Sequence, residues 1–121
     1  MQNSLKIDFQ EGDLGSLHPH DLMVYLRGIS IGKTLFEGLT RIDKNGKAQF
    51  AGAKSVDVSL NGLVYTFKLR KNHWSDGTPV TAFQYEAAWK EALAPVSFCP
   101  RPDLLYMIKN APEVKKGMIS L

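Results

Sequence analysis

The 121-residue chain carries 15 Lys and Arg against 12 Asp and Glu, which gives a net charge of +3. Apolar residues make up 44% and charged residues 22%, as in a soluble globular domain or a part of one. The basic residues are scattered, with Lys115-Lys116 as a tight pair, so they favour a solvated surface over a nucleic-acid footprint. A single cysteine, Cys99, excludes an internal disulfide. Residues 1–13 hold no long apolar run, so they are expected to be neither a signal peptide nor a membrane span.

The N-terminal part is expected to hold a strand, a loop and a helix. Ser4 to Phe9 alternate apolar and polar side chains, and this period of two predicts a half-buried strand. Residues 11–20 are rich in Gly, acidic residues and Pro, so they form a loop. Within residues 21–39, apolar residues from Ile31 to Leu39 follow helical spacing, and Gly38 marks the helix C-terminus.

Two hairpins are predicted next. Residues 40–42 form a short strand, residues 43–47 a turn, and residues 48–50 return from it. The stretch SVDVSL-NG-LVYTFKLR gives two alternating strands around Asn61-Gly62, a strong hairpin signal because both turn positions need φ > 0. A two-residue turn there places three apolar pairs on one buried face. The pairs are Leu60 with Leu63, Val58 with Tyr65, and Val56 with Phe67.

A loop and two helices are predicted to complete the chain. Residues 71–80 contain Asp-Gly and Thr-Pro and form the loop. Residues 81–84 fit a capping box at the start of a helix that ends near Leu93. After a Pro-rich crossing, residues 103–111 begin a second helix, which Pro112 ends.

The stretch GISIGKT, residues 28–34, ends in the Gly-Lys-Thr of a phosphate-binding loop. The consensus needs four residues between its first Gly and the Gly-Lys pair, and Gly28 leaves only three. The β-branched Ile29 and Ile31 also resist the φ > 0 backbone of such a loop. Nucleotide binding is therefore only a third interpretation. The favoured one is a helix start whose small residues let other elements pack closely.

Other candidate chemistry has a structural alternative in each case. His18 and His20 flank a proline and would bind a metal only with ligands from elsewhere, so we expect turn residues and no metal site. Trp74, Tyr85 and Trp89 suggest an aromatic platform, but the four-residue spacing of the last two favours core packing. The acidic residues lie in turns or on a helix surface and form no catalytic pair. The sequence thus indicates no enzyme and no cofactor.

Three motifs together carry a family resemblance that covers residues 14–110. They are SLHPH at 16–20, LFEGLTRID at 35–43 and YTFKLRKNHWSDGTPVTAFQYEAAWKEAL at 65–93. In these motifs the chain resembles the bacterial extracellular solute-binding proteins of family 5, the oligopeptide-, dipeptide- and nickel-binding receptors of ABC importers. The motifs LFEGL and SL-x-P-H are most similar to those of oligopeptide-binding members.

The resemblance implies a mixed α/β (α+β) fold. The chain would be the N-terminal part of a periplasmic-binding-protein type II-like, two-lobed receptor, with an antiparallel hairpin and packed helices. Residues 1–44 would be the first segment of lobe I, and residues 45–121 the incomplete start of the small extra domain. The Trp-Ser-Asp-Gly run would support the loop and helix without binding ligand. An ion pair between Arg70 and Asp76 across this loop is a further hypothesis.

The resemblance also implies a function. The chain is expected to be the substrate-binding component of an ABC peptide importer, present as a truncated N-terminal portion. The expected partners are an oligopeptide ligand and the membrane permease, with no nucleic acid. The expected state is a monomer in the periplasm or at the cell surface. The main alternative is a small basic domain that binds nucleic acid or another partner.

By the same resemblance, peptide contacts are expected in two stretches, 22–27 and 98–101. Met23, Tyr25 and Arg101 are the predicted peptide-binding residues. Peptide backbones are held strand-like by main-chain groups, with pockets that tolerate varied side chains. Because the acidic group that pairs with the ligand's amino terminus lies in the other lobe, these residues alone should bind peptide weakly or not at all.

Overall fold

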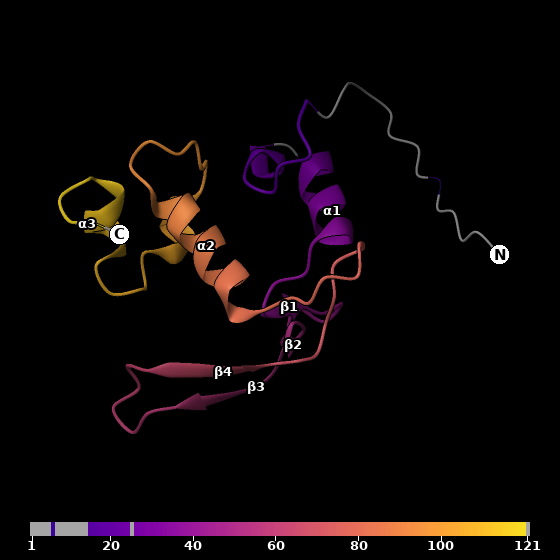
Figure 1. The fold of residues 1–121 in the computed structure, drawn as a ribbon, viewed down its shortest axis with the longest axis horizontal. Coiled ribbons are helices and arrows are strands. Elements are labelled where there is room, and N and C mark those ends of the chain that lie inside the picture. Colours follow the sequence, from indigo (N-terminus) through magenta and orange to yellow (C-terminus); the bar gives the residue numbers. More distant parts are fainter. Residues whose placement is uncertain (1–5, 7–14, 25, 121) are drawn as a thin grey trace.

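The computed structural model describes Lys6, residues 15–24 and residues 26–120. The chain runs from a helical pair through two hairpins to a longer helix and a short helical C-terminus (Figure 1). Helices and strands occupy separate stretches, so the predicted mixed α/β (α+β) class is confirmed. The strand predicted for Ser4 to Phe9 lies, apart from Lys6, outside the described residues. In chain order the elements are η1 (Asp21–Val24), α1 (Leu26–Leu35), β1 (Thr40–Ile42), β2 (Ala48–Phe50), β3 (Ala53–Val58), β4 (Tyr65–Leu69), α2 (Ala82–Leu93), η2 (Pro102–Leu105) and α3 (Ala111–Lys115).

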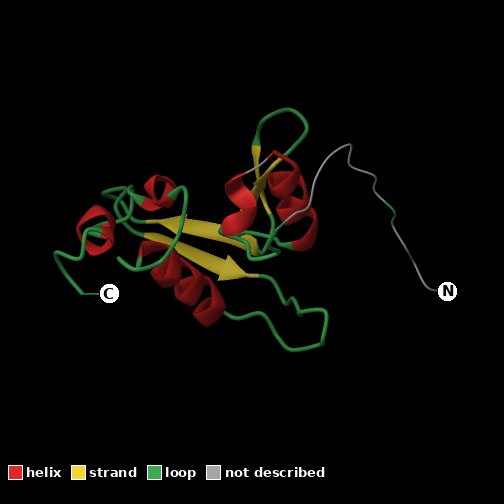
Figure 2. Cartoon of the chain, turned by 90° about the horizontal axis from the view of Figure 1, so that it is seen from above, coloured by secondary structure: helices red, strands yellow, loops and turns green. Residues whose placement is uncertain are grey.

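The four described strands form two separate antiparallel hairpins, β1–β2 and β3–β4 (Figure 2). The short strands at residues 40–42 and 48–50 occur where the sequence predicts them. In the longer hairpin, Val56 lies opposite Phe67 and Val58 opposite Tyr65, so the predicted register is confirmed. An alternating apolar pattern on both strands is therefore enough to set which residues face one another.

The turn between β3 and β4 differs from the prediction. Gly62 N–H donates to Ser59 O at 2.8 Å, which centres the turn on Leu60 and Asn61. Gly62 has a φ of 69°, whereas Asn61 stays outside the positive-φ region because its Oδ1 accepts from Leu63 N–H at 3.1 Å. The predicted Leu60–Leu63 pair on a buried face is therefore wrong. Leu60 is fully exposed and Leu63 is 80% exposed. The predicted burial of the Val58–Tyr65 pair is wrong as well, because these residues are 48% and 60% exposed.

Residues 28–34 lie inside α1, so the Gly-Lys-Thr sequence is helical and forms no phosphate-binding loop. Gly28 packs directly on η1, because a Cβ at this position would overlap Leu22 O. Leu22 itself is only 3% exposed. Small residues therefore permit a close contact, as the favoured interpretation predicts. The helix ends at Leu35, earlier than the apolar spacing up to Leu39 suggests.

A compact junction joins the end of the first segment to the hairpins. Leu39 O accepts from the N–H groups of Ala51 and Ala53, both at 3.0 Å. These two alanines are 2% and 0% exposed, respectively. Between them, a Cβ on Gly52 would overlap the hydroxyl of Tyr85 on α2. Small side chains at 51–53 therefore let β3 begin against both the preceding segment and α2.

The loop before α2 is closed by local hydrogen bonds. Asp76 Oδ1 accepts from the N–H and the hydroxyl of Thr78, at 2.9 and 2.7 Å. The Arg70 guanidinium donates instead to Phe50 O at 3.5 Å. The hypothesis of an Arg70–Asp76 ion pair is therefore wrong, because the aspartate completes its own turn.

Helix α2 begins and ends where the sequence predicts. At its start Thr81 N–H donates to the Gln84 side-chain oxygen at 2.7 Å, as a capping box requires. The helix ends at Leu93, two residues before Pro95, because a proline disfavours helical geometry in the residue before it. Among the described residues, no helix is both long and apolar enough to cross a bilayer.

Helices α2, η2 and α3 pack against one another and form a unit that we call the helical corner (Figure 1). Its core consists of Leu93, Ala111 and Val114, which are 7%, 1% and 9% exposed. Lys115 of α3 links this helix to the end of α2 and the turn after it. Its ammonium group donates to three backbone carbonyl oxygens, those of Ala92 at 3.2 Å, Ala94 at 2.9 Å and Ser97 at 2.9 Å.

The prediction of one helix over residues 103–111 is wrong. The stretch forms the short η2, then turns, and α3 begins only at Ala111. Asn110 has a φ of 66° and separates the two. Pro112 stands in the first turn of α3 instead of ending a helix. This placement is favourable because a first-turn residue needs no N–H partner within the helix.

Candidate functional site

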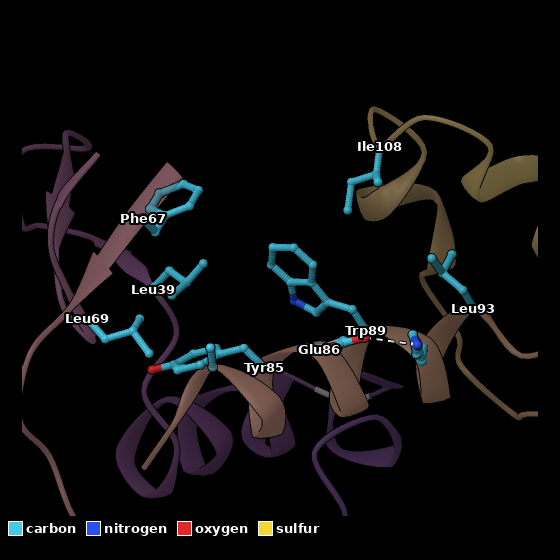
Figure 3. A pocket seen from close by; sticks show the side chains of 10 residues that line it. Leu39, Phe67, Leu69, Tyr85, Glu86, Trp89, Leu93 and Ile108 are labelled. Carbon is cyan, nitrogen blue, oxygen red and sulfur yellow. Dashed lines mark ion pairs between the residues drawn. The ribbon is translucent and has the colours of Figure 1, made fainter. Parts of the chain in front are cut away.

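An open apolar cavity of about 420 Å³ lies between the β3–β4 hairpin and α2. Figure 3 shows side chains from the strands facing side chains that rise from the helix. We call this surface the apolar groove. Its labelled apolar lining residues are Leu39, Phe67, Leu69, Tyr85, Trp89, Leu93 and Ile108.

Two sequence periods build the walls of the apolar groove. Phe67 and Leu69 stand two apart on β4 and so share one face of the strand. Tyr85 and Trp89 stand four apart on α2 and so share one face of the helix. Their spacing predicts core packing, but the structure leaves Trp89 39% exposed. The two faces point toward each other without closing into a core.

The ionisable groups beside the groove are arranged for packing and not for catalysis. Glu86 and Lys90, one turn apart, form an ion pair of 2.9 Å at the rim (Figure 3). Burial raises the pKa of the Tyr85 phenol above its ordinary value of 10.0, and the nearby charge of Glu37 adds to this shift. The phenol therefore stays protonated at neutral pH and is no nucleophile. This wall can bury apolar side chains, which is the largest favourable term in most protein contacts.

The predicted peptide-binding residues are described to different extents. Met23 belongs to η1, but its side chain, like the whole of Tyr25, lies outside the described residues. Arg101 is exposed and forms a bidentate pair with Asp103, at 2.9 Å to Oδ1 and 2.8 Å to Oδ2. This pair lowers the pKa of the Asp103 carboxyl and raises that of the guanidinium. Peptide binding by these three residues stays a prediction.

The structure also brings together residues that the sequence keeps far apart. His18 Nε2 lies 3.2 Å from Glu91 Oε1 on α2. The rings of His18 and His20 meet edge to face, with centroids 5.1 Å apart. Sequence reasoning treats the two histidines as turn residues and misses Glu91, because no local pattern links a loop near the start of the chain to the last turn of α2.

Comparison with known proteins gives the chain a family. Residues 48–119 match the family described as bacterial extracellular solute-binding proteins, family 5 Middle. Over 107 residues the chain is 41% identical to the oligopeptide-binding protein OppA of Bacillus subtilis. The aligned stretch covers 88% of this chain and 19% of that protein.

Solved structures agree with the sequence matches. Listeria monocytogenes OppA bound to peptide is similar with a TM-score of 0.74 and 34% identity, over 78% of this chain and 19% of that one. Haemophilus influenzae OppA in complex with RPPGFSPFR is similar with a TM-score of 0.77 and 30% identity, over 87% of this chain and 21% of that one. The chain therefore spans about a fifth of the length of these relatives.

Proposed function

Since the chain belongs to the bacterial extracellular solute-binding proteins of family 5, we propose that it is the N-terminal portion of the substrate-binding component of an ABC peptide importer. The agreement of sequence and fold carries this proposal, since the same stretch that is 30% identical to Haemophilus influenzae OppA also matches its structure with a TM-score of 0.77. Its partners would then be an oligopeptide and a membrane permease, at the cell surface or in the periplasm. It would bind and deliver its ligand without catalysing a reaction, as a monomer that makes no contact with nucleic acid.

The domain boundary is part of the same proposal. Residues 1–44 would belong to lobe I and residues 45–121 to the start of the small extra domain. The family match begins at residue 48, close to this boundary. The boundary falls in the turn between β1 and β2, whose strands pair with each other. The small β1–β2 hairpin would therefore be the connection between the two parts.

The apolar groove would be the surface on which the remainder of the receptor packs. Its walls carry large apolar side chains, yet Trp89 stays 39% exposed. A chain that spans about a fifth of its relatives would leave such faces without partners that the rest of a receptor would supply. Apolar faces of this kind gain free energy on burial, about 25 cal/mol per Å².

Arg101 would contact the peptide only in competition with Asp103. The guanidinium is already held by both carboxylate oxygens of that residue. A peptide carboxylate would have to replace or share this pair, which is exposed and therefore weak. Met23 and Tyr25 would contribute from η1 and the residue after it. Contact of this portion alone with a peptide would be weak, because the rest of the binding surface would lie in the other lobe.

The proposal is tested by exchanging segments. The matched segment of Bacillus subtilis OppA is replaced by this chain, and peptide binding to the folded chimera is measured by calorimetry. We expect binding comparable to that of the parent protein. Arg101→Ala in the chimera should weaken it by about 1 kcal/mol, as expected for an exposed charge, while Arg41→Ala on β1 serves as the matched control. A chimera that melts like the parent but binds no peptide would contradict the proposal.

The remaining alternatives predict other results. Micromolar peptide binding to the 121-residue chain by itself would show that the other lobe is not required. Binding to nucleic acid that falls steeply with added salt would support the small basic domain instead.

A further inference from the structure

We propose that His18, His20 and Glu91 form a binding site for a divalent transition-metal cation of the Zn²⁺ type. One ligand atom from each of these three residues lies within 4.8 Å of the others. Two imidazoles and one carboxylate are a ligand set that suits Zn²⁺ and its neighbours in the first transition row. The proposal departs from the expectation that both histidines are only turn residues.

The separation of two of the ligands already suits a metal. His18 Nε2 and Glu91 Oε1 are 3.2 Å apart. Zinc bonds to nitrogen and oxygen of about 2.0–2.1 Å place two ligands of a tetrahedral site about 3.3 Å apart. A cation can therefore bind between these two atoms with little movement of either. His20, whose ligand nitrogen lies within 4.8 Å of both atoms, would complete the set by moving closer to the cation.

The backbone holds the two histidines in place. His18 O accepts from the N–H groups of Asp21 and Leu22, at 3.0 and 3.1 Å, which ties the turn to the start of η1. Pro19 between the histidines restricts the backbone further. The His18 and Glu91 side chains are 45% and 55% exposed, so both can rotate onto a cation without repacking a core.

The protonation of His18 is compatible with this role. His20 N–H donates to His18 Nδ1 over 3.4 Å, so Nε2 carries the proton that faces Glu91. Binding a metal through Nε2 needs the other tautomer, with the proton on Nδ1. The change gives up this long hydrogen bond and the contact of the Nε2 proton with Glu91. The metal then takes the place of the proton between Nε2 and the carboxylate.

Such a site would join two distant parts of the chain. The histidines stand in the loop before η1, and Glu91 stands in α2, so the cation would fix this loop against the helix (Figure 1). Three protein ligands leave a fourth position for water or another donor. Because the metal binds the folded chain, it should raise the melting temperature as its concentration rises.

The test is a titration of the 121-residue chain with ZnCl₂, followed by calorimetry and by thermal melting. We expect one Zn²⁺ per chain and a higher melting temperature. His20→Gln and Glu91→Gln should each weaken binding about tenfold or more, because each removes a direct ligand and the loss of even an outer-shell partner costs about 10–100-fold. His73→Gln is the matched control, since His73 is exposed in the loop before α2. Circular dichroism verifies that each variant is folded.

Cobalt provides an independent readout. Co²⁺ in place of Zn²⁺ should give visible absorption of the intensity that four-coordinate N/O sites show, and His20→Gln should reduce it. An unchanged zinc affinity in folded His20→Gln would overturn the proposal and leave His18–Glu91 as a plain ion pair. Equal losses in His20→Gln and His73→Gln would overturn it as well, because they would indicate non-specific binding to exposed imidazoles.

Discussion

The helical corner and the two hairpins differ in how their side chains are used. In the corner, Leu93 and Ala111 are almost fully buried, and the Lys115 ammonium satisfies three carbonyl oxygens. In the hairpins, the strands are paired along their length except for one irregularity between Ala53 and Ser55, but every residue of β1 and β2 is exposed. The tip of the longer hairpin carries Leu60, which is fully exposed.

This difference shows which part of the chain buries its own apolar side chains and which part leaves them exposed. A two-stranded hairpin is marginal in water unless its apolar face packs on something. Here that face borders the apolar groove and remains open. The corner, by contrast, has its own small core. We therefore expect stability to depend strongly on buried residues of the corner and weakly on exposed residues of the hairpins.

The largest expected effect comes from emptying the core of the corner. Leu93→Ala should lower the free energy of unfolding by about 3 kcal/mol, because it removes buried methyl groups and leaves a cavity. Leu60→Ala, the matched change at the hairpin tip, should change it by less than about 0.5 kcal/mol. Urea denaturation followed by circular dichroism measures both. Equal losses in the two variants would mean that the hairpin tip is buried in solution and that the contrast is false.

A smaller effect is expected where backbones, not side chains, are in contact. Gly28→Ala should destabilise the chain by about 2 kcal/mol, because the added methyl group must push α1 away from Leu22 O. Gly32→Ala is the control one turn later, where a Cβ would only touch Leu22 Cδ1 at 3.6 Å. It should stabilise the chain by about 0.5–1 kcal/mol through helix propensity.

Thermal melting of the two glycine variants measures the difference. If both substitutions raise the melting temperature, η1 does not pack on α1 as described. In that case the N-terminal helical pair would resemble the hairpins, which lack partners within the chain, more than the corner.

Sequence patterns predict the local structure well where one interaction dominates. The capping box gives the start of α2, and the alternation of Val56 and Val58 gives the register with β4. They fail where two local choices compete. Asn61 has both the backbone preference for a two-residue turn and a side chain that can accept from Leu63 N–H, and the second wins.

Long-range features are predicted only in part. The spacing of Tyr85 and Trp89 predicts that they share one face of α2. Whether this face is buried or lines an open groove depends on which other segments pack against it, and no local sequence pattern gives that information. The pairing of His18 with Glu91 has no signal in the sequence, because it joins a loop to a helix far along the chain. The family resemblance supplies the fold class that periodicity leaves open.

The smallest expected effect concerns the turn of the β1–β2 hairpin, which is held by hydrogen bonds to the charged carboxylate of Asp43. Asp43 Oδ1 accepts from the N–H groups of Lys47 at 2.9 Å and Asn45 at 2.8 Å. These hydrogen bonds, led by that from Lys47, hold the pKa of the carboxyl below its ordinary value of 3.8. A carboxyl with a lowered folded-state pKa stabilises the fold above its unfolded pKa, and the contribution is lost as pH falls through the folded-state pKa.

Asp43→Asn keeps the acceptor oxygen but cannot ionise, so the variant should lose less stability than the parent chain between about pH 5 and about pH 2. Urea denaturation at the two pH values measures this difference, and identical losses in both proteins would show that the turn is held by geometry alone.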